Sequence, residues 1–308
     1  ELLYDGDKIV GVKAVGYDGT TYEIYGDSVI LATGGYIGDA KMVEENWGTM
    51  PNTVAATIND GAGIKMGQAA GGTTYMMAVA PMIHILQVPN MIKNDDLSAD
   101  QKAVLSALAL VKGEKAVTIH GEDLDPTLTE AMIPGYKYYN VYTEDQINEF
   151  KTVGFSENFA SATSMFMGQG GSFTVGTPIA DLDTILEVGM QYNNVLKASS
   201  ISDLAAQIGC DEAVLSATLG GNETTYYAVI CSGYTYGTVG GLDVDVNMNV
   251  LRADGTPIEN LFAVGTDSMG VENIEGKPYT PWGGQAQSWT FVSGYLGGHA
   301  AAEYGLTK

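Results

Sequence analysis

Basic side chains are scarce in this sequence. Lys and Arg total 14 against 37 Asp and Glu, which gives a formal net charge of −23 at pH 7, and Arg252 is the only arginine. Nucleic-acid binding requires a basic surface that neutralises phosphates. The composition therefore excludes a nucleic-acid-binding protein and disfavours adhesion to an anionic membrane surface.

Cysteine and long apolar runs are also lacking. Cys210 and Cys231 are too few for a disulfide framework and lack metal-ligand spacing, so we expect two buried thiols. The most apolar stretch, residues 74–92, is interrupted by two prolines, which argues against a membrane-spanning helix. We expect a soluble part of a longer protein, in the bacterial cytoplasm or exported if a leader precedes Glu1.

Glycine and tyrosine, by contrast, are abundant, with 40 and 18 residues among 308. A chain of this length corresponds to about two domains. Alternating runs at 8–16 and 22–25, separated by an Asp-Gly turn, predict antiparallel strands. The continuous apolar run at 27–33 predicts a strand buried on both faces of a parallel or mixed sheet. Residues 60–70 predict a helix that Asp60 caps.

The middle of the sequence differs from its two ends in composition and in its secondary-structure patterns. It is rich in tyrosine and includes a predicted helical pair at 200–220, whereas strand and turn patterns return toward the C-terminus, before a last helix at 285–304. We predict an α/β fold in which residues 1–115 and 231–308 form one sheet domain. Residues 116–230 form a second, α+β domain.

Five sequence blocks carry a more specific signal, because their order and spacing fit one family. They are DSVILATGG at 27–35, NDGAGIKMGQAAGG at 59–72, YYAVICSGYTYGTVGGLDVD at 226–245, GTPIENLFAVGTDSMG at 255–270 and GGQAQSWTFVSGYLGG at 283–298. Together they resemble the flavoproteins that include soluble fumarate reductases, urocanate reductase and 3-ketosteroid dehydrogenases. The resemblance implies FAD as the cofactor, held by a Rossmann-like sheet domain under an inserted capping domain.

One block of that family is missing. The family opens with a strand, a G-x-G-x-x-G turn and a helix whose N-terminus receives the FAD pyrophosphate. The nearest pattern here, Gly61, Gly63 and Gly67, has the wrong spacing and fits glycines that pack a helix closely. The chain therefore resembles the family from midway onward, and we expect a missing N-terminal FAD-binding segment as a partner.

Two glycine pairs are candidates for flavin contact. Thr33-Gly34-Gly35 ends a buried strand, where small residues allow a ligand to lie against the backbone, although a tight strand-ending turn explains them as well. Gly283-Gly284 precedes the last helix, whose partly positive N-terminus would stabilise a reduced, anionic flavin; an ordinary glycine entry to a helix is the alternative.

The resemblance assigns further residues to the cofactor. Thr238, Gly240 and Gly241 match a T-x-G-G turn where flavin, substrate and cap meet in the family, and Asp267 stands where relatives place a polar residue near the ribityl chain. The full set of predicted cofactor-binding residues is Ala32, Thr33, Gly34, Gly35, Thr238, Gly240, Gly241, Gly265, Asp267, Gly283, Gly284 and Gln285.

The sequence departs from the fumarate reductases at the residues that bind dicarboxylates. The two histidines of their H-H-T-M-G-G motif correspond to Tyr236 and Gly237, and an arginine before the final G-G turn corresponds to Pro281. Their G-K-R-F-x-N-E motif lines up with the acidic segment 121–127. Because a dicarboxylate needs bidentate, charge-assisted contacts, we predict that fumarate is not the substrate.

Tyrosine is the side-chain type that could supply acid–base chemistry instead. A phenol donates and accepts hydrogen bonds, and 3-ketosteroid dehydrogenases use tyrosines in this role. Tyr234 and Tyr236 bracket the position of the lost histidine, and His120 is the third catalytic candidate. The alternative for both tyrosines is amphipathic packing. His84 remains ambiguous.

Two functions remain open on this evidence. The first is an FAD-dependent reductase or dehydrogenase that acts on CH–CH bonds, moving hydride between flavin N5 and an activated C=C bond of an uncharged or weakly charged substrate. It would need an electron-donor protein or domain. The second is a non-catalytic fragment or binding module that keeps the capping domain but cannot retain FAD alone.

Overall fold

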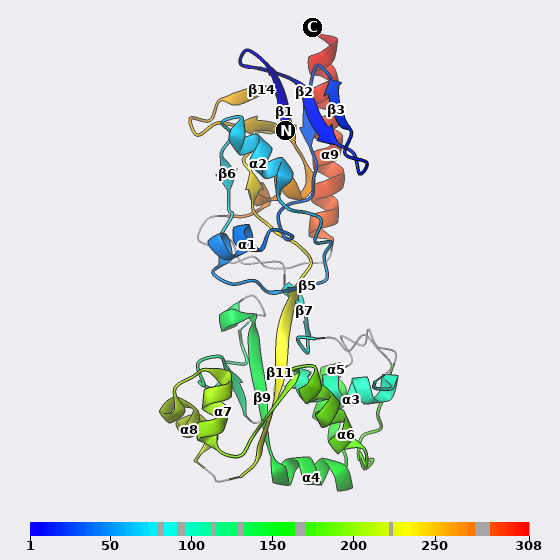
Figure 1. The fold of residues 1–308 in the computed structure, drawn as a ribbon, viewed down its shortest axis with the longest axis vertical. Coiled ribbons are helices and arrows are strands. Elements are labelled where there is room, and N and C mark those ends of the chain that lie inside the picture. Colours follow the sequence, from blue (N-terminus) through cyan, green and yellow to red (C-terminus); the bar gives the residue numbers. More distant parts are fainter. Residues whose placement is uncertain are drawn as a thin grey trace. The chain divides into compact units, whose positions relative to one another are not determined.

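A computed structural model describes most of the chain (Figure 1). The described residues are 1–78, 83–90, 96–111, 115–128, 132–163, 171–221, 224–274 and 284–307. Gly283 and Pro281 lie outside them, and so does the side chain of His84. The chain forms two compact units, unit 1 from Glu1–Met82 and Thr235–Lys308 and unit 2 from Ile83–Tyr234.

The first unit boundary falls earlier than the sequence predicted. Residues 83–115 were expected in the first domain, whereas they belong to unit 2. The reason is that α3 (Ala99–Leu110) packs on the sheet of unit 2, where the side chain of Asn140 donates to the carbonyls of Leu108 and Ala109 at 2.9 and 2.7 Å. The helix supplies core residues to unit 2 along most of its length.

Unit 1 contains an antiparallel sheet near the N-terminus. It consists of β1 (Leu2–Asp5), β2 (Lys8–Val15) and β3 (Thr21–Tyr25), paired in that order. Asp18 closes the turn between β2 and β3 by accepting from the backbone N–H of Thr20 at 2.9 Å. The predicted hairpin is confirmed.

A second sheet of unit 1 positions the candidate site. Its order is β13 (Asn249–Leu251), β14 (Pro257–Ala263) and β4 (Val29–Leu31), with β4 parallel to β14. The predicted buried strand at 27–33 is thus shorter than expected. Two short strands, β12 (Gly241–Leu242) and β6 (Thr74–Tyr75), pair separately, and β5 is Asn52–Thr53.

The helices that the structure describes in unit 1 are α1 (Ala40–Trp47), α2 (Ala62–Ala69) and α9 (Gln285–Leu306). Two short 3₁₀ turns, η3 (Gly265–Asp267) and η4 (Met269–Glu272), precede α9. The last helix is confirmed. The cap of α2 differs from the prediction, because Gly61 in a left-handed conformation is the N-cap; Asp60 accepts from the N–H of Ala62 at 3.1 Å.

Unit 2 is built on an antiparallel sheet. Its strands run in the order β10 (Val195–Ala198), β11 (Tyr226–Thr235), β9 (Lys137–Thr143) and β8 (Ala116–Thr118), and β7 (Ile83–Gln87) also pairs with β11. Cys231 on β11 is buried as predicted, whereas Cys210 is only half-buried. The observed mixture of helices and sheets confirms the α/β class.

Helices surround this sheet in Figure 1. They are α4 (Glu144–Thr152), α5 (Glu157–Thr163), α6 (Leu182–Gln191), α7 (Ile201–Ile208), α8 (Glu212–Leu219) and the 3₁₀ turn η2 (Pro134–Tyr136). The pair α7 and α8 confirms the predicted helical pair. Ser200 caps α7 and Asp211 caps α8 through side-chain oxygens that accept from backbone N–H groups of the first turn.

Candidate functional site

The turn that follows β4 is tied to η3 by a buried carboxylate. Asp267 is fully buried, and its side chain accepts from the backbone N–H and hydroxyl of Thr33 and from the N–H of Gly35 at 3.0 Å. The Thr33 hydroxyl in turn accepts from the N–H of Gly63 in α2 at 2.9 Å. The structure thus brings three sequence-predicted residues, Thr33, Gly35 and Asp267, into one hydrogen-bonded cluster.

The predicted T-x-G-G turn packs against the same cluster. Thr238 is fully buried and its hydroxyl accepts from the N–H of Tyr36 at 3.2 Å. A Cβ at Gly35 would approach that hydroxyl far more closely than real Cβ contacts do. A Cβ at Gly241 would likewise collide with the carbonyl oxygen of Asp267. Close packing within the protein therefore requires glycine at both positions, independently of any cofactor.

Two other predicted glycines are less crowded. A Cβ at Gly265 would find its nearest atom among the described residues, the Thr290 hydroxyl, at 3.8 Å, and one at Gly284 would find the Ser288 hydroxyl at 4.0 Å. Gly284 is exposed, and so is Ala32, which follows β4, so both leave the backbone accessible to a ligand. Gly265, by contrast, is buried with its N–H bonded to the Ser293 hydroxyl at 2.8 Å, and Gly240 is packed on the backbone of Met77.

The N-terminus of α9 has an unused acceptor and unused donors. Gly284 is its N-cap and offers no side chain, so N–H groups of the first turn lack a capping partner. Gln285, the first helical residue, is 7% exposed, and its Oε1 has no hydrogen-bond partner. Trp289 anchors the helix to η3 by donating from Nε1 to the carbonyl of Gly265 at 3.1 Å. An anionic or polar group of a ligand would match this helix start.

The three predicted catalytic side chains differ in environment. Tyr234 is buried in unit 2, and its hydroxyl donates to the carbonyls of Val88 and Pro89 at 2.8 and 2.6 Å. Tyr236 lies in unit 1 and is 50% exposed. His120 is exposed in the turn after β8. The hydroxyl of Tyr234 therefore has structural partners, and Tyr236 is the more accessible phenol.

The only arginine of the sequence has a structural contact in a surface turn. Arg252 is exposed, and its Nη1 donates to the carbonyl of Pro257 at 3.1 Å, across the turn formed by Asp254 and Gly255. The side chain thus stabilises a surface turn between β13 and β14. It offers no bidentate contact within the cluster around Asp267.

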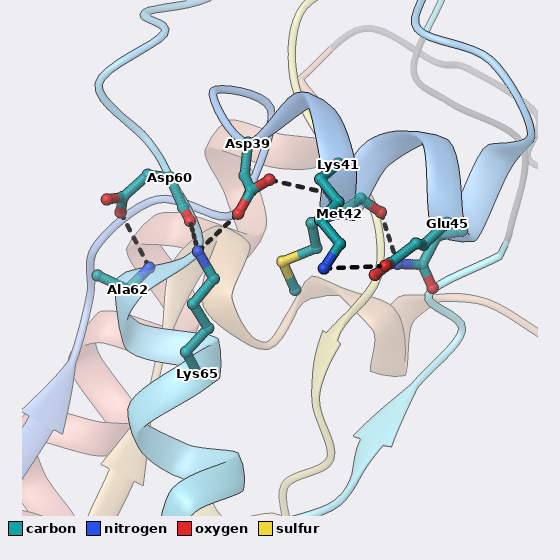
Figure 2. Close-up of polar contacts among 8 residues, drawn as sticks. Asp39, Lys41, Met42, Glu45, Asp60, Ala62 and Lys65 are labelled. Carbon is teal, nitrogen blue, oxygen red and sulfur yellow. Dashed lines mark hydrogen bonds and ion pairs between the residues drawn. The ribbon is translucent and has the colours of Figure 1, made fainter.

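A polar cleft between α1, α2 and β6 was not predicted. It has a volume of about 300 Å³ and is lined by both charge signs together with Met42 and Met77. Figure 2 shows Lys65 reaching from α2 to the carboxylate of Asp39 at 2.7 Å and to the carbonyl of Asp60 at 2.6 Å. The Lys65 ammonium and the N–H of Met42 hold the pKa of Asp39 below its usual range. No short motif marks this cleft, because its residues meet only through tertiary packing.

A second residue that sequence reasoning missed is Glu272. Its Oε2 is buried without a hydrogen-bond partner, and burial raises the pKa of the carboxyl group.

Over the described ranges, no group of three or more His, Cys, Asp or Glu side chains is arranged to hold a metal ion. In the same part of the chain, no helix has the length and apolar character needed to cross a membrane.

Comparison with known proteins shows which flavoproteins the chain resembles. Residues 154–277 match the family model of an FAD binding domain, FAD_binding_2. The chain is 24% identical to a vinyl phenol reductase of Lactiplantibacillus plantarum, over 90% of this chain and 60% of the relative. It is also 24% identical to a probable fumarate reductase, Ifc3, of Shewanella frigidimarina, over 100% of this chain and 49% of the relative. The chain thus spans about half to three-fifths of these relatives.

Solved structures agree on the fold. The open conformation of a flavocytochrome c3 fumarate reductase matches 99% of this chain and 51% of its own, with a TM-score of 0.55 at 20% identity. A 3-ketosteroid delta1-dehydrogenase from Sterolibacterium denitrificans matches 98% of this chain and 58% of its own, with a TM-score of 0.56 at 17% identity. The predicted family resemblance is confirmed.

The chain is thus similar to an FAD binding domain over residues 154–277 and to flavoproteins of the fumarate reductase type over most of its length, which implies FAD as the cofactor. The residues present fit part of an FAD site. The exposed backbone at Gly284, the start of α9 without a side-chain cap and the unpartnered Oε1 of Gln285 are what a polar ligand edge requires. The clusters around Thr33 and Thr238 are filled by protein atoms.

Proposed function

We propose that this chain forms part of an FAD-dependent oxidoreductase that acts on the C=C bond of an uncharged or weakly charged substrate. A bound flavin would supply the hydride chemistry. The observation that carries the substrate proposal is the surface position of Arg252, the only arginine of this sequence, so this part of the protein supplies no guanidinium to clamp a dicarboxylate. The vinyl phenol reductase is named for a substrate of the proposed kind, a phenol with a vinyl group.

The chain's own residues would bind and orient the cofactor and move a proton. The N-terminus of α9 would hold an anionic edge of the flavin through free N–H groups, and the Gln285 amide would add a polar contact. Tyr236 would donate the proton to the substrate, because its hydroxyl is on an accessible side chain and a phenol can both donate and accept. Tyr234 and His120 are weaker candidates.

Further partners are part of the proposal. A segment carrying the G-x-G-x-x-G turn would bind the FAD diphosphate, since the described glycines do not form that cradle. An electron-donor protein or domain would reduce the flavin.

The purified protein that carries this chain tests the proposal directly. We expect a flavin absorbance band near about 450 nm and reoxidation of the reduced protein by a vinyl phenol, with little or no reoxidation by fumarate. Tyr236→Phe should lower turnover by about 10²-fold while leaving stability unchanged. Tyr234→Phe is the matched comparison, and it should cost stability because it leaves two carbonyls without their hydroxyl donor.

Three outcomes would contradict it. A colourless protein that does not take up added FAD would favour the non-catalytic fragment. Fumarate turnover comparable with that of vinyl phenol would refute the substrate class. Normal turnover by Tyr236→Phe would remove Tyr236 from the mechanism.

A further inference from the structure

The carboxylate of Asp267 occupies an unusual position for a buried charge. The side chain is fully buried, and no ion pair to it is formed by any lysine or arginine that the structure describes. Its oxygens instead accept from the N–H of Thr33, the hydroxyl of Thr33 and the N–H of Gly35. An isolated buried carboxylate is costly, so these donors must replace its water shell.

The backbone donors lie on both sides of a left-handed glycine. Gly34 has φ +96° and Gly35 has φ +80°, and the N–H groups of Thr33 and Gly35 converge on the two carboxylate oxygens. Successive backbone N–H groups in a tight turn form a concave nest that binds anions. We propose that Asp267 is a built-in anion that fills the nest at residues 33–35 and thereby fixes the turn after β4. Asp267 is then a positioning residue.

Helix α2 completes the environment of the carboxylate. Gly63, at the second position of α2, donates its N–H to the Thr33 hydroxyl at 2.9 Å, and that hydroxyl donates to Asp267 at 3.0 Å. A Cβ at Gly63 would lie 2.5 Å from Asp267 Oδ2, so glycine is what allows α2 to approach the charge. The positive end of the helix dipole adds a favourable field at this distance.

The structure distinguishes two roles for Asp267 that the sequence alone could not: direct contact with a cofactor and support of the turn at residues 33–35. The resemblance assigned Asp267 to the cofactor, whereas its oxygens already have protein donors. We infer that it acts on a bound flavin through the turn that it holds. That consequence rests on the proposed function, but the nest itself exists without flavin and is tested without it.

Removal of the carboxylate tests the nest by chemical rescue. Asp267→Ala deletes one carboxylate group and leaves the donors around a cavity of that size, which formate matches in shape and charge. Trp47 and Trp289 lie in unit 1, and the sequence has no tryptophan at 83–234, the range of unit 2, so intrinsic tryptophan fluorescence reports the unfolding of unit 1. We expect Asp267→Ala to lower the melting temperature of unit 1 by about 5 °C or more. Formate at about 0.3 M should restore at least half of the loss.

Matched controls isolate the effect of the anion. Sodium chloride at equal ionic strength should not restore stability, and Asp267→Asn should not respond to formate because its amide fills the space. Asp245→Ala is a control in the same unit, since Asp245 also accepts from backbone N–H groups, of Asn247 and Asn249 at 2.9 Å, but in a partly exposed turn. Water can replace that carboxylate, so formate should have no specific effect there.

The proposal makes a definite prediction even for an unstable variant. If Asp267→Ala does not fold in plain buffer, refolding in formate should recover the tryptophan signal of unit 1. Asp267→Ala without any formate-specific stabilisation, or Asp267→Asn with wild-type stability, would overturn the nest. Loss of flavin from wild-type protein would refute the proposed function and leave this result unaffected.

Discussion

Two adjacent glycines in the turn after β4 should respond very differently to the same substitution. Gly34 and Gly35 both have positive φ, of +96° and +80°, which costs an alanine about 1–2 kcal/mol. At Gly34 the new Cβ would lie 2.9 Å from the side-chain amide of Asn59, which is able to rotate away. At Gly35 it would collide with the hydroxyl of Thr238 and approach Thr266 Cγ2 at 3.0 Å.

The difference sets the expected magnitudes. Gly34→Ala should lower the free energy of unfolding of unit 1 by about 1–2 kcal/mol, from backbone strain alone. Gly35→Ala should lower it by about 2–5 kcal/mol, because overpacking of a buried site adds about 1–3 kcal/mol to the same backbone strain. Thr238→Ala removes the colliding hydroxyl, so the double variant should be more stable than the sum of the two single losses predicts.

Urea denaturation followed by tryptophan fluorescence measures these differences, because the tryptophans report on unit 1. The single variants and the Gly35→Ala/Thr238→Ala pair form one double-mutant cycle. A cost for Gly34→Ala equal to or above that for Gly35→Ala would refute the packing argument. Additive losses in the cycle would show that Thr238 is not the limiting contact.

Two further predictions concern one hydrogen-bonded side chain in each unit. Asn140→Ala should destabilise unit 2 by about 1–3 kcal/mol, because it removes the side-chain amide that donates to the carbonyls of Leu108 and Ala109, of which Leu108 keeps the Tyr142 hydroxyl as a donor at 2.8 Å; far-UV circular dichroism in urea measures it, with the exposed Asn148→Ala as a near-neutral control. The pKa of Asp39 is lowered chiefly by Lys65, so its contribution to stability is present above pH 3.8 and lost as the pH falls through the folded value. Asp39→Asn should therefore cost more at about pH 6 than at about pH 3, and equal costs at both would contradict the assignment.

The outline of the fold was largely predictable because it rests on local patterns. The hairpin at β2 and β3 follows from alternating residues and an Asp-Gly turn, and α9 follows from a long uninterrupted helical segment. The unit boundary at 82/83 was not predictable from composition or from secondary-structure patterns. Residues 99–110 belong to unit 2 because α3 packs into its core and accepts hydrogen bonds from Asn140, on a strand about 30 residues later in sequence.

The candidate site shows where residue patterns stop being informative. Sequence patterns and the family resemblance placed Thr33, Gly35 and Asp267 in the predicted cofactor-binding set on separate grounds, and the structure shows that they lie together. It could not tell whether a glycine makes room for a ligand or for the protein itself, since both require the same residue. That distinction depends on what lies beyond each Cα, which only the tertiary structure supplies.

Gly237 illustrates the distinction and leads to a last prediction. It corresponds to a family histidine, yet a Cβ there would meet no atom of the residues that the structure describes within 4 Å, and its φ lies outside the left-handed region. The nearby Gly241, by contrast, packs on the carbonyl of Asp267. Gly237→Ala should therefore change the free energy of unfolding by less than about 0.5 kcal/mol, whereas Gly241→Ala should cost several times more.

The open space beside Gly237 also bears on substrate size. If the missing histidine side chain leaves room for a larger, uncharged substrate, then Gly237→Leu should raise the KM for a vinyl phenol by about tenfold or more without loss of folding. Gly265→Leu serves as a comparison, because positive φ at Gly265 should add a stability cost that Gly237→Leu lacks. Tryptophan fluorescence in urea measures stability, and flavin reoxidation measures turnover. A stable Gly237→Leu variant with unchanged KM would mean that the substrate does not occupy the space beside Gly237. The absence of a histidine side chain there would then not serve to enlarge the substrate site.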